Sequence, residues 1–241
     1  MIPRPEILIA VDIEARELEP ELTALLDRIS PTDCRRRAEC CRLLPHMSLM
    51  EAAYAINGLI ALEKSTQKRA WLKLTEYFLV NAARITACPF LDQGGCLIYN
   101  RRAFGCRAYG LWSPNAYATK QKDAQQAQAV VAQAWAGLGI QLPKSVTSHS
   151  LPYCNQVTPQ DGLAITDQDL NAIERDIRAL DRRLAPHSKR FAAEFQNDLS
   201  FAIVVGQMGL QPALRAKVAV TRELTTTGKS LTLDRLLDPF V

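Results

Sequence analysis

The stretch that decides how this chain folds is Cys88-Pro89-Phe90-Leu91-Asp92-Gln93-Gly94-Gly95-Cys96-Leu97-Ile98-Tyr99-Asn100-Arg101-Arg102-Ala103-Phe104-Gly105-Cys106-Arg107. A plain surface loop would not carry Phe90 and Ile98, and a core strand would not have Gly94 and Gly95 in its middle. A loop held by metal–thiolate bonds and packed over a small apolar patch accounts for both. The alternative is three unrelated buried cysteines, because free cysteine is among the most buried residue types.

The chain has seven cysteines in 241 residues, and they are clustered. They are Cys34, Cys40, Cys41, Cys88, Cys96, Cys106 and Cys154. An odd number does not suit a disulfide framework. Residues 1–21 turn acidic after a short apolar run, so no secretory signal peptide and a cytoplasmic location are expected. A reducing compartment keeps thiols free, which favours metal or redox chemistry.

The composition is that of an ordinary globular protein, with a net charge of +4. That small excess gives no argument for nucleic acid or for an anionic membrane as a partner. No apolar run approaches the length of a bilayer span. The expected partner is therefore a protein or a small-molecule substrate, which the sequence does not identify.

Apolar residues recur at helical spacing over much of the chain, so we predict a mainly α fold around a cysteine-rich, irregular metal-binding layer. Residues 1–160 are predicted to form the cysteine-cluster domain, and 161–241 a helical extension packed on it. An extended piece is predicted at 7–11, and an irregular segment at 139–165. The predicted helices are 19–29, two within 47–86, 119–138, 167–184, 189–206, 210–223 and 230–237.

Thiolates are soft ligands that suit zinc, iron and iron–sulfur clusters. The spacings Cys34-x5-Cys40-Cys41, Cys88-x7-Cys96 and Cys96-x9-Cys106 match no standard zinc-finger or ferredoxin pattern. Adjacent side chains diverge on a regular helix or strand. Cys40 and Cys41 therefore need a bent backbone to reach one mononuclear site, or they serve two metals or one larger cluster.

Arginines flank both groups of cysteines, and cations favour the thiolate form. They are Arg35, Arg36, Arg37 and Arg42 in the first group, and Arg101, Arg102 and Arg107 in the second. The alternative is a solvated basic surface that binds phosphate. Phe90, Tyr99, Phe104 and Tyr109 could stack nucleic-acid bases, but packing of the loop is the preferred interpretation, and nucleic acid is not the expected partner.

These residues resemble a known family. The run Cys-Pro-Phe-Leu from Cys88, Gly-x-Leu-Ile-Tyr with Cys96 at x, then Arg102 and Cys106-Arg107-x-Tyr109, is similar to the hallmark of the YkgJ-type cysteine-cluster proteins. Their other signature, C-x-x-C-x-x-C-C, falls on Cys34, Arg37, Cys40 and Cys41, with an arginine at its second cysteine. The resemblance covers about residues 34–110, and it departs again at Ala103, where proline is usual.

The resemblance implies a bound zinc or iron centre and says little about a reaction. A related group, the flagellin lysine methylases, has a similar cysteine motif and is associated with an iron–sulfur cluster, but its activity is not carried over. All seven cysteines are candidate metal ligands. Arginine cannot ligate a metal, so at Arg37 either a coordination position is open or Cys154 takes the vacant role.

Other candidate residues carry less weight. His46 and His149 lie near cysteines in the sequence and are ordinary histidines unless they ligate the metal, while His187 is expected to be structural. Asp92 and Glu39 are expected to be solvated carboxylates. We therefore expect an iron centre, most simply an iron–sulfur cluster, used in redox or modification chemistry, with no catalytic residue assigned. The alternative is a non-catalytic zinc module that binds a partner.

Overall fold

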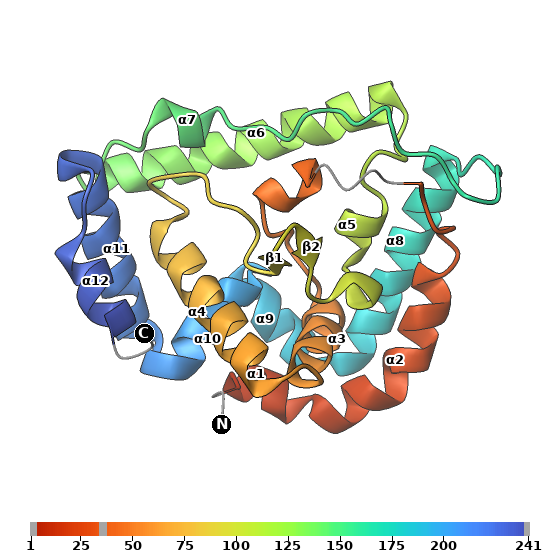
Figure 1. Ribbon diagram of the computed structural model, residues 1–241, viewed down its shortest axis with the longest axis horizontal. Helices are drawn as coiled ribbons and strands as arrows, with labels where there is room; N and C mark the ends of the chain where they lie inside the picture. The colour runs from red at the N-terminus through yellow and green to blue at the C-terminus, as the bar shows by residue number, and fades with distance from the viewer. Residues whose placement is uncertain (1–3, 34–37, 239–241) are drawn as a thin grey trace.

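The computed structural model describes residues 4–33 and 38–238, and this part of the chain is mainly helical (Figure 1). Its first helices are α1 (Glu6–Ala10), α2 (Asp12–Leu26), η1 (Glu39–Arg42), α3 (Leu49–Ile60), α4 (Lys64–Val80), η2 (Tyr99–Arg101), α5 (Phe104–Arg107) and α6 (Pro114–Gly137). They continue with α7 (Lys144–Thr147), α8 (Asp167–Asp181), η3 (Arg182–Leu184), α9 (His187–Phe195), α10 (Leu199–Met208), α11 (Leu210–Thr227) and α12 (Leu231–Leu237). A small hairpin joins β1 (Leu91–Asp92) to β2 (Gly95–Cys96). The prediction of a mainly α fold is confirmed.

Helix α3 lies at the centre of the molecule, in contact with α2, α4, α8 and α9. It begins at a capping box, in which Ser48 Oγ accepts from Glu51 N and Glu51 Oε2 accepts from Ser48 N. Almost every residue from Leu49 to Leu59 is buried, so the helix has no solvent face. A helix that is apolar all round belongs in a core.

The prediction of two helices within 47–86 is confirmed, because α3 ends at Ile60 and α4 begins at Lys64. Gly58 lies inside α3 and does not mark the break between the two helices. A Cβ at this position would be 2.6 Å from Arg101 Cδ, so the missing side chain lets η2 approach α3.

The predicted extended piece at 7–11 is wrong, since Glu6–Ala10 is helix α1. A short apolar run does not reveal its period. Ile7, Leu8 and Val11 are buried while Ile9 is 56% exposed, which is the pattern of a helical face. Helix α2 also begins earlier than predicted, at Asp12, and accommodates Pro20 inside it.

The single helix predicted at 189–206 is wrong as well, because the chain reverses between α9 and α10. Gln196 and Asn197 have positive φ values of 53° and 58°, which end α9. The Asp198 carboxylate then accepts from the backbone N–H groups of Ser200 and Phe201, which caps α10. By contrast, the helix predicted at 167–184 is confirmed as α8 followed by η3. Its apolar residues form a buried stripe of Leu170, Ile173, Ile177, Leu180 and Leu184.

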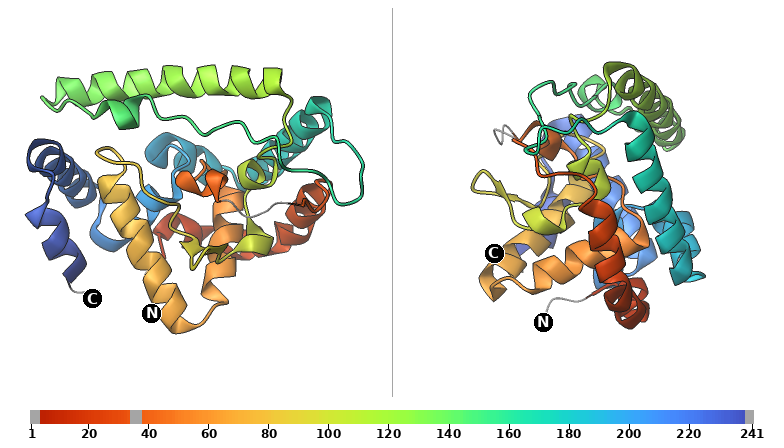
Figure 2. Two further views of the ribbon diagram at one scale, coloured as in Figure 1. Left: turned by 45° about the horizontal axis from the view of Figure 1, so that its top comes forward. Right: turned by 90° about the vertical axis from the view of Figure 1, so that its right-hand side faces the viewer.

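Helix α6 crosses one side of the molecule, clear of the central helices (Figures 1 and 2). It starts before the predicted residue 119, because Ser113 Oγ accepts from Ala116 N and Pro114 takes the first helical position. None of its described residues is buried. Three large apolar side chains at or near its end are exposed: Val130 at 66%, Val131 at 48% and Leu138 at 53%.

The strap, defined as residues 149–160, is irregular as predicted and runs beneath α6. Tyrosine hydroxyls hold it: Tyr109 Oη donates to Pro152 O at 2.6 Å, and Tyr117 Oη donates to Leu151 O at 2.9 Å. At its far end, an isolated bridge pairs Pro159 with Thr32. The strap is therefore fixed to three separate parts of the chain.

The residues from 161 onward pack closely against those before 160. Helix α8 contacts α2 and α3, while α10 and α11 contact α4. The predicted division at about residue 160 stays a prediction. No helix in the described ranges combines the length and apolar character needed to cross a bilayer.

Candidate metal centre

Five of the predicted ligands, from three separate segments, line one cavity, which we call the cysteine cavity. They are Cys40, Cys41, Cys88, Cys96 and Cys106. Apolar residues complete the wall, among them Phe90, which is 2% exposed, and Ile98, which is 4% exposed. The prediction that the loop packs over an apolar patch is confirmed.

The first pair of cysteines lies on a bent backbone, as adjacent ligands require. Ala38 has a positive φ of 57°, and Cys41 departs from helical angles inside η1, with φ −90° and ψ 18°. The two Sγ atoms are consequently 3.9 Å apart. Cys88 N donates to Cys41 O at 2.6 Å and joins the first cysteine segment to the second.

Cys96 is placed by the hairpin. Asp92 pairs with Gly95, and the two residues between them, Gln93 and Gly94, have φ values of 47° and 80°. Positive φ at both central positions is the type I′ pattern, which suits the twist of a two-residue hairpin. The next ladder pair, Leu91 with Cys96, brings this thiol to the edge of the cavity.

Cys106 is placed by α5, and the buried Glu51 holds that helix. Glu51 Oε1 accepts from Phe104 N at 2.8 Å, at the start of α5, while Oε2 accepts from Ser48. Burial raises the pKa of Glu51, against the effect of these hydrogen bonds. Glu51 was not predicted from the sequence, although the Ser48-x-x-Glu51 spacing is a capping-box signature.

Burial disfavours ionisation of Cys88 and Cys106, whereas Cys41 ionises more readily than a free thiol. Burial raises the pKa of Cys88 to about 12, and it raises that of Cys106 well above the usual value, with further increases from neighbouring cysteines. A hydrogen bond from Cys40 lowers the pKa of Cys41. Such a set is held largely as neutral thiols, and a bound metal would displace their protons.

Among the described arginines near the cysteines, Arg102 is the one that acts on them. Burial raises the pKa values of Cys96 and Cys106, and the charge of Arg102 opposes both increases. The other arginines are engaged elsewhere: Arg101 with Glu19 at 2.9 Å, Arg107 with Asp27 at 3.1 Å, and Arg42 with Glu39 at 3.3 Å. Arg35, Arg36 and Arg37 lie outside the described residues.

Cys154 does not line the cysteine cavity. It lies on the strap, in an adjoining cavity that Cys40 and Cys106 also line. Its Cβ is 3.3 Å from the position that a Cβ on Gly110 would take, so the strap passes close to the residues after α5. Cys34 falls outside the described residues.

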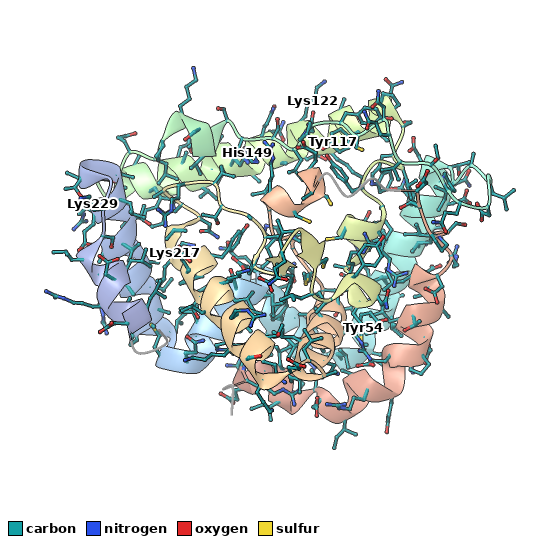
Figure 3. All side chains as sticks on the ribbon, viewed as in Figure 1. Tyr54, Tyr117, Lys122, His149, Lys217 and Lys229 are labelled. Carbon is teal, nitrogen blue, oxygen red and sulfur yellow. The ribbon has the colours of Figure 1, made fainter. Side chains whose placement is uncertain are left out.

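The three histidines are separate from the cysteine cavity. His46 Nδ1 bonds to Gln196 O at 2.8 Å. His149 lies on the strap with its Nε2 buried, without a hydrogen-bond partner among the described residues, and burial lowers its pKa (Figure 3). His187 is the first residue of α9.

The two carboxylates predicted to be solvated are both paired. Asp92 accepts from Lys73 at 2.8 Å and Arg69 at 3.3 Å, which fastens the hairpin to α4 and lowers its pKa. Glu39 pairs with Arg42 within η1. Both residues therefore have structural partners.

Within the described ranges, no three His, Cys, Asp or Glu side chains form a group that could hold a metal ion. The comparisons with known proteins add no name: no family model matches the chain, and neither a curated protein nor a solved structure matches it. Membership of the YkgJ-type family therefore stays a prediction from the motif.

Proposed function

We propose that this protein holds an iron–sulfur cluster through the thiols of the cysteine cavity and uses it in redox or modification chemistry. The observation that carries the proposal is the convergence of Cys40, Cys41, Cys88, Cys96 and Cys106, from three segments, on one cavity. Unrelated structural cysteines would have no reason to meet. Clustered thiols in a cavity are the preferred ligands of iron–sulfur centres and of zinc.

A cluster places weaker demands on the separation of its thiol ligands than a single ion does. One tetrahedral ion with metal–sulfur bonds of about 2.3 Å needs several sulfurs about 3.8 Å apart. Cys40 and Cys41 meet that condition at 3.9 Å, but among the described residues no third ligand completes a group. In an iron–sulfur cluster the thiolates bind different iron atoms, so their sulfurs lie further apart than in a single-ion site.

A bound cluster would supply a one-electron redox centre or, with one position open, a Lewis acid. The residues of the chain would supply its surroundings. Phe90 and Ile98 form an apolar wall, and Arg102 brings a positive charge beside an anionic set of thiolates. The likeness of residues 88–109 to the YkgJ-type hallmark supports the same proposal. We also propose that the chain belongs to that family.

The second candidate is a zinc-binding module without catalytic activity, in which the metal fastens the irregular layer and the helical surface binds a partner protein. The 3.9 Å separation of the Cys40 and Cys41 sulfurs favours it, because that is the edge of a tetrahedral zinc site. Cys34, in the same segment, stays a predicted ligand.

Anaerobic purification followed by metal and acid-labile sulfide analysis tests the proposal. We expect iron and sulfide in similar amounts, together with a brown colour that bleaches on reduction. A colourless protein with about one equivalent of zinc and no sulfide would establish the second candidate. Protein that takes up neither metal under reconstitution would overturn both.

Matched cysteine variants test the ligand set. Cys106→Ser should lose metal and lower the melting temperature by roughly 10 °C or more, because thiolate sites contribute on the order of 10 kcal/mol to folding. Cys154→Ser is the control, since Cys154 lies outside the cysteine cavity, and it should retain metal and spectrum. If Cys154→Ser also lost metal while its fold stayed intact, the strap would supply a ligand.

A further inference from the structure

The cavity next to the cysteines, which we call the strap cavity, lies between η1, α5 and the strap. Its lining includes Arg102, Tyr109 and Cys154. Its volume is about 190 Å³. Pockets for drug-sized ligands typically have about 300–1,000 Å³, so this one suits a small molecule.

The strap cavity and the cysteine cavity share a wall. Ala38, Cys40, Arg102 and Cys106 line both of them. A molecule in the strap cavity would therefore be separated from a cluster in the cysteine cavity by this one layer of side chains, which includes two of the proposed ligands, Cys40 and Cys106. That position is suited to a substrate or a co-ligand of the centre.

Arg102 determines which chemical group a molecule bound in the strap cavity should have. Its guanidinium is stacked on the Tyr99 ring, 3.7 Å from the centroid, and its Nε donates to Tyr99 O at 3.0 Å. Among the described residues no carboxylate forms an ion pair with Arg102. The terminal nitrogens thus keep donors for a planar or tetrahedral oxyanion, which guanidinium groups bind in a bidentate manner.

The remaining charges of the cavity are already balanced. Arg107 also lines it, but this side chain pairs with Asp27 and donates to Asn100 O at 2.9 Å. The carboxylate on the wall, Glu39, pairs with Arg42. Among the described residues that line the cavity, Arg102 is therefore the cation that no carboxylate pairs with, although its charge also acts on the neighbouring thiols.

We propose that the strap cavity binds a small oxyanion, a carboxylate or a phosphate group, on Arg102 beside the metal centre. The inference rests on the proposed function for the chemistry that the bound molecule would undergo, but the anion site itself is built from protein atoms. Tyr109, whose hydroxyl fixes the strap at Pro152, also lines this cavity.

Calorimetric titration of the metal-loaded protein, in a buffer of Tris and chloride, tests this proposal with inorganic phosphate and with succinate as probes. At least one probe should bind with a dissociation constant below about 1 mM. Preference for one probe identifies the group as a phosphate or a carboxylate. The absence of binding for both probes would overturn the inference.

Variants locate the site. Arg102→Gln should weaken binding by about tenfold or more, the effect of losing a hydrogen bond between charged groups. Arg102→Lys keeps the charge without the planar fork and should lie in between. Arg190→Gln makes the same change in net charge at the exposed Arg190–Glu194 pair of α9 and should leave affinity within twofold of the parent.

Metal content, measured on the same samples, separates the two proposals. Normal metal content without anion binding would overturn the proposed anion site and leave the proposed metal centre unaffected. The converse outcome is a protein that never takes up metal but binds the anion, with binding lost in Arg102→Gln. It would support the anion site and overturn the metal centre. Equal affinity in Arg102→Gln and Arg190→Gln would overturn the assignment to Arg102.

Discussion

Lys217 is a cation placed in a largely apolar part of the molecule, between α11 and α4 (Figure 3). Its Nζ donates to Asn81 Oδ1 at 2.7 Å and lies 4.1 Å from the centroid of the Phe78 ring. Burial lowers the pKa of Lys217 to about 8, although the charge of Asp198 opposes that change. The charged form is therefore less favourable in the folded protein than in the unfolded chain.

The contribution of Lys217 to the free energy of unfolding therefore rises with pH. Between pH 8 and about 10.5 the unfolded chain binds more protons than the folded one, so the free energy of unfolding increases across that window, by up to about 3 kcal/mol. Lys217→Met should remove this increase and stabilise the protein at neutral pH. Urea unfolding of both proteins at pH 7.5 and 10 measures the difference, and parallel pH profiles would contradict it.

Glu51 is a buried charged residue that joins the start of α3 to the start of α5. Glu51→Gln replaces one acceptor oxygen with a donor that meets an N–H group, and this should cost about 1–3 kcal/mol of unfolding free energy. Loss of metal should accompany it, because α5 carries Cys106. The exposed Glu17→Gln in α2 is the control, and an equally small effect of both changes would contradict this role.

At the scale of elements, the hairpin shows how backbone geometry places a thiol. Gly94 has φ +80°, and a Cβ there would meet no atom within 4 Å, so Gly94→Ala tests conformation alone. The left-handed region costs a non-glycine residue about 1–2 kcal/mol. Gly95→Ala is the matched control, because its φ is not positive and its nearest contact would be 3.8 Å. Thermal unfolding should show a lower melting temperature for Gly94→Ala than for Gly95→Ala.

The sequence predicted best those elements whose apolar period is long. The apolar spacing from Leu170 to Leu184 predicted a helix correctly. The five apolar residues at 7–11 were too few to show a period. The reversal depends on positive φ at Gln196 and Asn197. Apolar spacing does not report φ, so it predicted a helix that continues through these residues, although asparagine is one of the non-glycine residues that adopt positive φ most often.

The sequence predicted which cysteines belong to the site, but not how they are arranged in space. Clustering in the sequence indicated that the thiols would meet, and the structure brings Cys40, Cys41, Cys88, Cys96 and Cys106 to one cavity. The separate place of Cys154 depends on how the tyrosines hold the strap, which is a tertiary property. Glu51 was missed because its second partner, Phe104 N, lies far away in sequence.

At the scale of the whole molecule, the central helices and the α6–strap layer differ in how they are held. Helix α3 is buried along almost its entire length, while none of the described residues of α6 is buried. The layer is attached by polar contacts instead: Gln121 Nε2 donates to Leu151 O at 2.7 Å, and Gln128 Nε2 donates to His149 O at 3.0 Å. Few buried apolar contacts mean a low free energy of local opening.

Hydrogen–deuterium exchange should therefore divide the molecule into two levels. Amides of α3 should exchange only by global unfolding, and those of α6 orders of magnitude faster, by opening of the layer alone. Tyr117→Phe removes the hydroxyl that donates to Leu151 O, at a cost of about 1 kcal/mol, and should speed exchange in the strap about fivefold without changing α3. Tyr54→Phe, which removes a hydroxyl of α3 near Thr23, is the control and should leave the strap unaffected. Equal protection of α3 and α6 would mean that the layer and the core unfold as one unit, and that access to the strap cavity requires unfolding of the whole protein.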